Sequence, residues 1–353
     1  MISGMAPLLE AVQRNCHIAD ARHAREMTLC TYLLEMREFY RWEHDLPPGA
    51  APPREDLGRW ISEREALWEA VADEEFQPLP VAGALHDPFA AVAINAMLLP
   101  AGLVYGAGIG RFHKPHFFLG RLARTEHHDG LTVLVSDCEY ARDLTAIPAA
   151  LQGGTVIVRR ESLRQVLWEK AEAWGIKQKP GATARALAAY GYENDAVGAL
   201  ARMTDREVDT LILHERGEHA AGRLLGPEWE EMVAGFTSRR PELLARAVRD
   251  NLADCLSTLP ALIGQENMAS LHFWFANFDG LRRELFAPLV AAYETFAASG
   301  DFEPMARVAA VGGHHWLEAA RRLLVMSRDA AAGGEAAIAA IAGNPASLGL
   351  VKL

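Results

Sequence analysis

The stretch Leu103-Val104-Tyr105-Gly106-Ala107-Gly108-Ile109-Gly110 marks the point where the pattern of the chain changes from helical to β-type. Three more short β-type runs follow it, at 116–124, 131–135 and 155–158. The turn signals His128-Asp129-Gly130 and Gln152-Gly153-Gly154 separate these runs. Together they predict about four strands in a small, mostly antiparallel sheet inserted around residues 100–160.

Glycine occupies every second position in this stretch, at Gly106, Gly108 and Gly110. The dinucleotide-binding fingerprint is Gly-x-Gly-x-x-Gly and leads directly into a helix. This chain has the spacing Gly-x-Gly-x-Gly, with no predicted helix after it. Glycines within a strand more often mark a bulge or a close backbone approach, so we assign the run to the sheet rather than to a phosphate cradle.

The segments on both sides of the sheet are predicted to be helical. One helix is predicted over 7–44, and the Pro- and Gly-rich segment 46–53 ends it. A later helix is predicted to begin with a capping box at Thr204 and Glu207 and to end at Gly226-Pro227. Other helices are predicted at 56–72, 88–99, 161–174, 228–236, 241–262, 267–298 (in one or two pieces) and 304–328.

The predicted fold is therefore α+β and predominantly α-helical, a helical bundle with a small sheet inserted around residues 100–160. It divides into a helical segment at 1–99, a sheet region with one helix at 100–176, a helical domain at 177–330 and an Ala/Gly-rich tail at 331–353.

Composition narrows the classes of partner and compartment. The net charge of −11 at pH 7 opposes binding to nucleic-acid phosphates and to anionic membranes. No apolar run reaches the length of about 18 residues that a membrane-spanning helix needs, and no secretory-signal pattern is present. The cysteines are scattered without a Cys-x-x-Cys, as in proteins with free thiols in a reducing compartment. We expect a cytoplasmic protein without nucleic-acid or membrane partners.

The densest group of acid/base and metal-ligating side chains is His214-Glu215-Arg216-Gly217-Glu218-His219. Each helical residue advances about 100°, so His214 and Glu218 share a face, whereas His214 and His219 lie about 140° apart. The two histidines therefore cannot chelate one ion on a regular helix, which excludes the zinc-protease motif His-Glu-x-x-His. What remains is a His214/Glu218 pair with Glu215 beside it.

Polar residues also fall in the apolar seam of the predicted 7–44 helix. Asp20 and His23 lie there, and burying them is unfavourable unless they are paired or bind a metal. A hydrogen-bonded Asp–His core pair and a solvent-exposed helix end are the structural alternatives. The full seam, at spacings of three and four, is Leu9, Val12, Cys16, Asp20, His23, Met27, Cys30 and Leu34.

Two later helices offer further candidates. Asp250 and Asp254 are four residues apart, although Arg246 at i−4 favours an ion pair for Asp250. His272 lies in the apolar run 271–275, where a histidine is more often a hydrogen-bonded core residue than a ligand.

Taken together, these pairs predict a metal site assembled from facing helices. His/carboxylate ligation suits Fe, Mn or Zn. We expect the metal to activate water or bind a substrate oxygen while Glu215 acts as the base, in hydrolysis or oxidation of a small molecule. The predicted ligands are His214, Glu218, His23, Asp20, His272 and Asp254.

Two other functions stay open. One is a non-catalytic scaffold that packs its aromatic faces (Trp229, Trp274, Phe275, Phe278) internally or on a partner. The other is a metal-free enzyme with Glu215 or His272 as general base. The whole chain resembles members of an uncharacterised bacterial protein family with no established activity, so the resemblance implies no site residues. The mixed ligand set is similar in logic to di-iron carboxylate proteins, but their Glu-x-x-His signature is absent.

Overall fold

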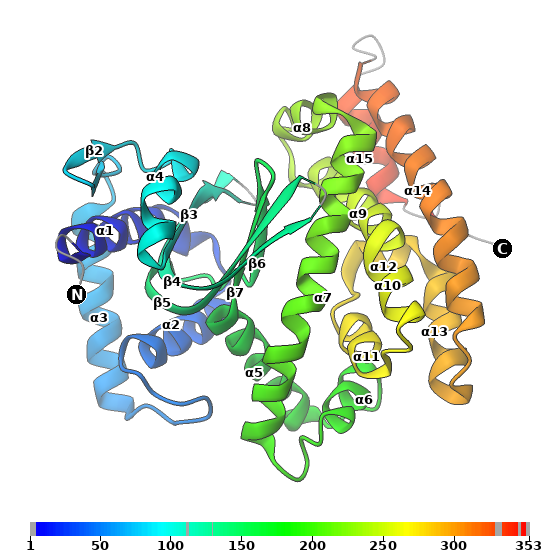
Figure 1. Cartoon of the computed structure of the whole chain (residues 1–353), viewed down its shortest axis with the longest axis horizontal. Helices are drawn as coiled ribbons and strands as arrows, with labels where there is room; N and C mark the ends of the chain where they lie inside the picture. The colour runs from blue at the N-terminus through cyan, green and yellow to red at the C-terminus, as the bar shows by residue number, and fades with distance from the viewer. Residues whose placement is uncertain (1–4, 111–112, 129, 329–333, 345–346, 351–353) are drawn as a thin grey trace. The chain divides into compact units, whose positions relative to one another are not determined.

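The computed structural model describes residues 5–110, 113–128, 130–328, 334–344 and 347–350. The chain forms two compact units, Met1–Glu169 and Lys170–Leu353 (Figure 1). The fold is α+β and mostly helical, which confirms the predicted class. None of the described helices is long and apolar enough to cross a membrane.

The N-terminal unit begins with helices that differ from the prediction at one point. The single helix expected over 7–44 is wrong, because the backbone becomes extended at Met27 and Thr28, each with a ψ of 151°. The side-chain oxygen of Thr28 accepts a hydrogen bond from the Thr31 amide and caps the next helix. The helical elements are α1 (Met5–His23), η1 (Ala24–Glu26), α2 (Leu29–Glu43), α3 (Arg54–Val71), α4 (Ala91–Leu98), η2 (Leu99–Ala101) and the first part of α5 (Arg160–Lys177).

Five strands of this unit form one sheet, and a separate antiparallel hairpin joins β1 (Leu79–Val81) to β2 (Ala84–His86). The sheet order is β3 (Leu103–Ile109), β4 (Pro115–His128), β5 (Leu131–Arg142), β7 (Thr155–Arg159) and β6 (Ala149–Gln152). Neighbouring strands are antiparallel except β5 and β7, which are parallel. The mostly antiparallel sheet is thus confirmed, with one strand more than expected.

The two faces of this sheet have different neighbours, because successive strand residues point to opposite sides. One face, with Tyr105, Phe117 and Leu119, packs on α1. The opposite face carries a smaller apolar cluster formed by Val104, Phe118, Leu134 and Ile157.

Every secondary-structure element that the structure describes in the C-terminal unit is a helix. Helix α7 packs along α9 and η4, and α14 packs on α9 and α13. A buried apolar cluster, which includes Trp229, Leu252 and Trp316, joins these helices. Within the predicted Ala/Gly-rich tail, α15 packs on α9 and α14 and buries Ile338. The elements are α6 (Ala182–Ala189), α7 (Ala196–Leu225), α8 (Pro227–Ala234), α9 (Arg239–Ala253), η4 (Asp254–Thr258), α10 (Leu259–Gly264), α11 (Met268–Ala276), α12 (Gly280–Leu285), α13 (Ala287–Ser299), α14 (Glu303–Arg328) and α15 (Gly334–Gly343).

Candidate metal centre

Helix α7 carries the predicted His/Glu stretch, but it begins earlier than expected. Asp195 is its N-cap, and the Asp195 side chain accepts a hydrogen bond from the Gly198 amide at 2.9 Å. The capping box predicted at Thr204 is wrong: Thr204 lies inside the helix and donates to the Leu200 carbonyl at 2.7 Å. The predicted end at Gly226 is confirmed.

A close helix contact brings α7 against the segment that supplies the other acidic residues. Gly217 lies over Ala253, and a Cβ at position 217 would overlap the Ala253 carbonyl oxygen. The helix that contains Ala253 then passes into the π-helical segment η4 at Asp254. Single π turns within α-helices are frequent at functional sites, because they change the direction of the side chains that follow.

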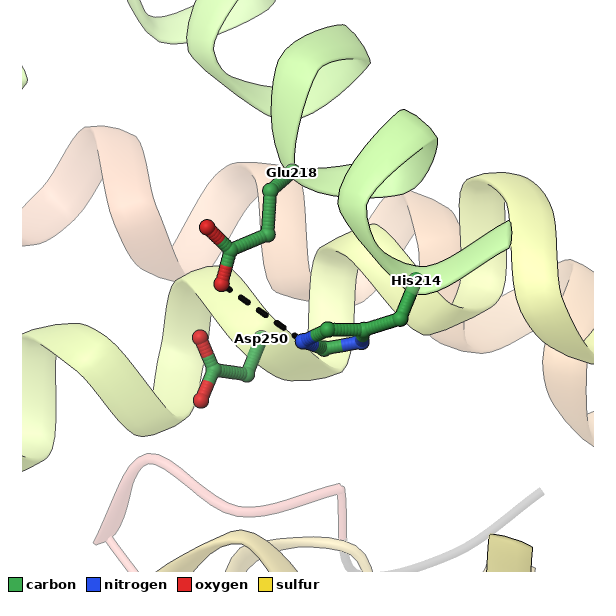
Figure 2. Close-up of side chains that lie close together, drawn as sticks. All are labelled: His214, Glu218 and Asp250. Atoms are coloured by element: carbon green, nitrogen blue, oxygen red, sulfur yellow. Dashed lines mark ion pairs between the residues drawn. The ribbon is translucent and has the colours of Figure 1, made fainter. Parts of the chain in front are cut away.

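Three side chains from α7 and α9 converge beside this contact (Figure 2). One ligand atom each from His214, Glu218 and Asp250 lies within 4.8 Å of the other two. His214 Nε2 is 3.5 Å from Glu218 Oε1. The three side chains are 21%, 15% and 10% exposed, so the group is shielded from bulk solvent without being sealed.

Asp254 holds the imidazole of His214 in place from the opposite side. His214 Nδ1 donates to Asp254 Oδ1 at 2.8 Å, and the indole Nε1 of Trp274 donates to the same oxygen at 3.1 Å. The other carboxylate oxygen of Asp254 accepts from Arg282. Both oxygens are therefore committed, and Asp254 acts here as a positioning residue that turns Nε2 of His214 toward Glu218.

Two arginines pair with these carboxylates. Arg249 Nη2 lies 2.9 Å from Glu218 Oε1 and 3.7 Å from Asp250 Oδ1. Arg282 pairs with Asp254. The cluster thus contains two paired guanidinium groups and four carboxyl groups, which belong to Glu215, Glu218, Asp250 and Asp254.

Bound protons balance the excess of carboxyl groups. Burial, with the nearby charge of Glu218, raises the pKa of Glu215 to about 8, and the same two causes raise the pKa of Asp250. Burial opposes the charged form of His214, but Asp254 and Glu218 outweigh it and raise the pKa of His214 well above its usual value. Burial also opposes ionisation of Glu218, yet Arg249 and His214 hold its pKa well below the usual range.

Asp250 converges with His214 and Glu218, although its sequence context favoured an ion pair with Arg246. Its expected partner Arg246 instead binds Glu242, with Arg246 Nε 2.9 Å from Glu242 Oε1. Asp250 faces Glu218 of α7 across the helix contact and lies beside Arg249 of its own helix. The four-residue spacing of Asp250 and Asp254 is the sequence feature that could have indicated its place, because residues four apart share a helix face.

Asp20 and His23 lie in the N-terminal unit, where each has its own partner. Asp20 is fully buried; its Oδ1 accepts from Lys114 Nζ at 3.0 Å and its Oδ2 from the Leu144 amide at 2.8 Å. Burial raises the pKa of Asp20 to about 6, although Lys114 lowers it. His23 Nδ1 lies 3.5 Å from Glu26 Oε1 at the end of α1. Neither residue belongs to the three that converge in the C-terminal unit.

His272 lies on α11 among aromatic rings. Its Nδ1 is 3.0 Å from the Tyr293 hydroxyl, and its ring centroid is 5.6 Å from that of Phe296. Burial lowers the pKa of His272, with the charge of Arg185 as a second cause. His272 is not among the three converging residues, and its contacts are those of a hydrogen-bonded residue beside an aromatic core.

Comparison with known proteins gives a family for both units. The model of the N-terminal domain of a family of unknown function (DUF6866) matches residues 7–159, and that of the C-terminal domain matches residues 164–344. No curated protein and no solved structure matches the chain. The resemblance to a family without an assigned activity is therefore confirmed, and the chain belongs to the DUF6866 family, with both of its domains present.

Proposed function

We propose that this protein is a metal-dependent enzyme whose C-terminal unit binds one divalent ion (Fe, Mn or Zn) through His214, Glu218 and Asp250. The observation that carries the proposal is the convergence of an imidazole and two carboxyl groups within 4.8 Å. Metal–ligand bonds of about 2.1 Å place ligand atoms at most about 4.2 Å apart, so a small inward movement would complete the site. An imidazole with two carboxylates suits each of these ions.

Asp254 supports this proposal. A carboxylate on the far nitrogen of a histidine ligand fixes its tautomer and orientation and makes the ligating nitrogen more basic. Asp254 holds Nδ1 of His214 at 2.8 Å in this manner, while Trp274 and Arg282 fix Asp254 itself.

The proposed reaction is hydrolysis or oxidation of a small molecule. A bound divalent ion would supply an activated water or polarise a substrate oxygen. Glu215 is buried beside the three ligands, and its pKa of about 8 lets it hold or release a proton near neutral pH. The positive charge of the ion would favour ionised Glu215 and so prepare it to act as a base.

A structural polar core is the second candidate function, and Arg249 favours it. The guanidinium group lies between Glu218 and Asp250 and already supplies a positive charge there. If the cluster serves only to stabilise the fold through this ion pair, the protein is a scaffold with a buried salt-bridge network. The two candidate functions predict different effects of added metal ions on metal content and on stability.

Elemental analysis of protein purified without a His-tag tests the metal site directly. We expect about one Fe, Mn or Zn ion per chain, and loss of that ion in His214→Ala and Asp250→Asn. His219→Ala, five residues along the same helix from His214, is the matched control and should keep the metal. Metal-free protein whose melting temperature is unchanged by added Fe, Mn or Zn would overturn the proposal.

Arg249→Gln separates the two candidate functions. Without metal, the variant should be less stable by about 3–5 kcal/mol, because it leaves buried carboxylates unpaired. For a metal site, added Mn²⁺ or Zn²⁺ should restore this stability, and the variant should bind the ion more tightly than the wild type. For a structural network, neither ion should restore it.

A cytoplasmic location is also part of the proposal. All four cysteines, namely Cys16, Cys30, Cys138 and Cys255, are free thiols, as expected in a reducing compartment. The net charge of −11 supports a small-molecule substrate over a nucleic acid or an anionic membrane.

A further inference from the structure

The glycine run of β3 forms one wall of a pocket in the N-terminal unit. Gly106 pairs with Phe118 and Gly108 with His116 in the antiparallel β3–β4 ladder, so these four residues share one face of the sheet. Along β3 and the residue that follows it, this face carries no side chains at positions 106, 108 and 110. The rings of Phe118 and His116 occupy the space over Gly106 and Gly110, so the hollow beside the strand lies over Gly108.

The two edge strands of the sheet enclose this hollow. β3 and β6 stand at opposite edges of the strand order, yet both line the same pocket of about 230 Å³. The approach of the edges is close, because a Cβ on Gly108 would lie 3.5 Å from the Gln152 amide. The sheet is therefore curled, and the pocket lies on the face opposite α1. Its apolar lining includes Ile109, Phe118, Ile147, Leu151 and Ile157.

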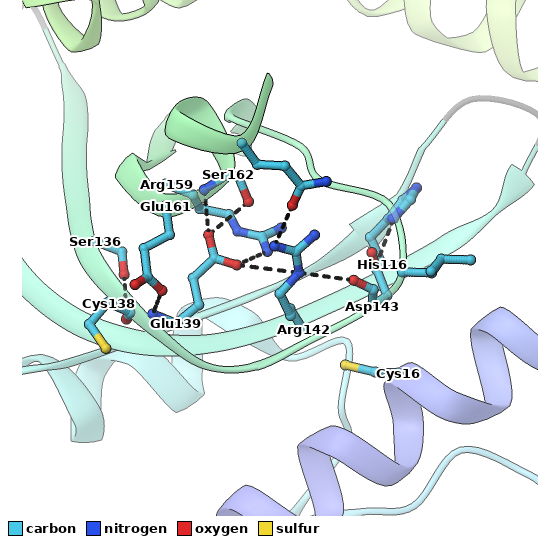
Figure 3. Close-up of polar contacts among 12 residues, drawn as sticks. Cys16, His116, Ser136, Cys138, Glu139, Arg142, Asp143, Arg159, Glu161 and Ser162 are labelled. Atoms are coloured by element: carbon cyan, nitrogen blue, oxygen red, sulfur yellow. Dashed lines mark hydrogen bonds and ion pairs between the residues drawn. The ribbon is translucent and has the colours of Figure 1, made fainter. Parts of the chain in front are cut away.

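Arg159 brings a buried charge to the lining. It is 5% exposed, its guanidinium carbon lies 4.7 Å from the Phe118 ring centroid, and its Nη2 donates to Glu139 at 2.5 Å (Figure 3). Its Nε has no hydrogen-bond partner among the residues that the structure describes. A buried N–H of this kind needs an acceptor, because leaving it unpaired costs about 1–3 kcal/mol.

His116 supplies a second polar group. Its Nδ1 donates to the fully buried Asp143 at 2.8 Å, and the Phe117 amide donates to the same carboxylate oxygen at 3.3 Å. This contact fixes the ring and leaves Nε2 as its remaining polar atom. Gly110 lies directly beside that nitrogen, since a Cβ there would be 2.7 Å from it.

From these contacts we propose that the pocket binds a small carboxylate with an apolar body. The apolar lining would take the body, while the Arg159 guanidinium and the Gln152 side-chain amide would donate to the carboxylate. Charge-assisted hydrogen bonds from a guanidinium group favour a carboxylate over an uncharged carbonyl. A cationic ligand would instead face the positive charge of Arg159. The pocket volume is below the range of about 300–1,000 Å³ that holds drug-sized ligands, which limits the body to a single ring or a short chain.

Fluorine NMR with 4-fluorobenzoate tests this proposal on the full-length protein. We expect saturable line broadening with a Kd at or below about 5 mM, and binding at least about tenfold weaker for 4-fluorobenzamide and for 4-fluorobenzylamine. Absence of binding to 4-fluorobenzoate in this range would overturn the proposal, and so would equal or stronger binding of either comparator.

Gly108→Leu locates the binding. A side chain at 108 meets only the flexible Gln152 amide at an ordinary contact distance, whereas Gly106 and Gly110 face rings at 2.5 and 2.7 Å. The added leucine should fill the pocket and weaken 4-fluorobenzoate binding at least about tenfold, with the melting temperature near that of the wild type. Gly58→Leu, at an exposed position with open space around it, should bind as the wild type does. Unchanged binding to a folded Gly108→Leu variant would place the ligand elsewhere and reject this pocket.

Discussion

At the scale of single residues, the charge state of the acidic cluster decides what it can do. Burial, together with the nearby charge of Glu218, raises the pKa of Glu215 so that it holds a proton near neutral pH. Burial opposes the charged form of His214, but the carboxylates of Asp254 and Glu218 outweigh it and keep His214 protonated. A metal ion that enters must displace protons, so metal affinity and pH are linked. The spacing of His214 and Glu218 can be read from the sequence. The excess of carboxyl over guanidinium groups around them cannot, because it depends on the packing of α9 and η4 against α7.

Glu215→Gln should change how stability depends on pH. A carboxyl group whose pKa is higher in the folded chain stabilises the fold below its unfolded value of about 4.3. That contribution is lost as the pH rises through the folded value of about 8. Between pH 5 and pH 8, the free energy of unfolding of the metal-free wild type should therefore fall by on the order of a few kcal/mol more than that of the variant.

Urea denaturation in the presence of a chelator measures this difference. Glu231→Gln, at an exposed position in α8, is the control and should follow the wild type at both pH values. If wild type and Glu215→Gln lose stability in parallel over this range, Glu215 does not carry a raised pKa.

Asp254→Asn should weaken metal binding without removing a ligand. Loss of the carboxylate that holds Nδ1 of His214 is expected to lower the affinity for Mn²⁺ or Zn²⁺ by about 10–100-fold. The pKa of His214 should fall as well, so the affinity should depend less steeply on pH. Calorimetric titrations at two pH values measure both effects, with the exposed Asp279→Asn as control. An unaltered affinity and pH dependence would show that Asp254 has no positioning role.

At the scale of elements, helix caps and π turns determine where a helix begins, ends or is interrupted, and the spacing of apolar residues alone does not reveal these points. The 7–44 seam keeps its spacing of threes and fours through Met27 and Thr28, so the pattern could not locate the break, although Thr28 is a recognisable N-cap. The continuous helix predicted over 241–262 is likewise interrupted by the π turn of η4, which has no signature in apolar spacing.

Gly217→Ala tests the contact between α7 and α9. The new methyl group would overlap the Ala253 carbonyl oxygen, and we expect a loss of about 1–3 kcal/mol in the free energy of unfolding. Gly222→Ala, on the same helix with open space around it, should instead gain about 0.5–1 kcal/mol from helix propensity. Chemical denaturation of both variants gives the comparison, and equal effects would contradict the close approach.

At the scale of the whole molecule, each unit has its own core and its own candidate site. The fold class was predictable because the change from helical to β-type patterning near 103 is local. The proximity of His214 and Glu218 was predictable because both lie on one helix, four residues apart. The approach of Asp250 to this pair was not predictable, because contacts between helices depend on tertiary packing that residue types do not specify.

Hydrogen exchange should separate the two sites within one molecule. Because ligands slow exchange where they stabilise local structure, Mn²⁺ or Zn²⁺ should increase protection in peptides from α7, α9 and η4. By the same reasoning, 4-fluorobenzoate should protect β3, β4 and β7. Mass spectrometry of peptides, digested after exchange of the full-length protein with each addition, measures both patterns. Protection by the metal in the strands, with none in α7, would contradict the assignment of the metal to the C-terminal unit.

The π turn of η4 also sets a rotational register. α9, η4 and α10 follow one another without an intervening loop, and each residue of a regular helix turns the chain by about 100°. A π turn contains about one residue more than an α turn for nearly the same rotation and rise, so η4 takes up an extra residue while α10 keeps its orientation to α9. A chain shorter by one residue between Asp254 and Leu259 would convert this π turn into an α turn and leave the side chains of Leu259 and Leu262 in the core. The same deletion inside α9 would turn every later residue by about 100°. At this point the chain therefore tolerates a change in length that the helices on either side do not.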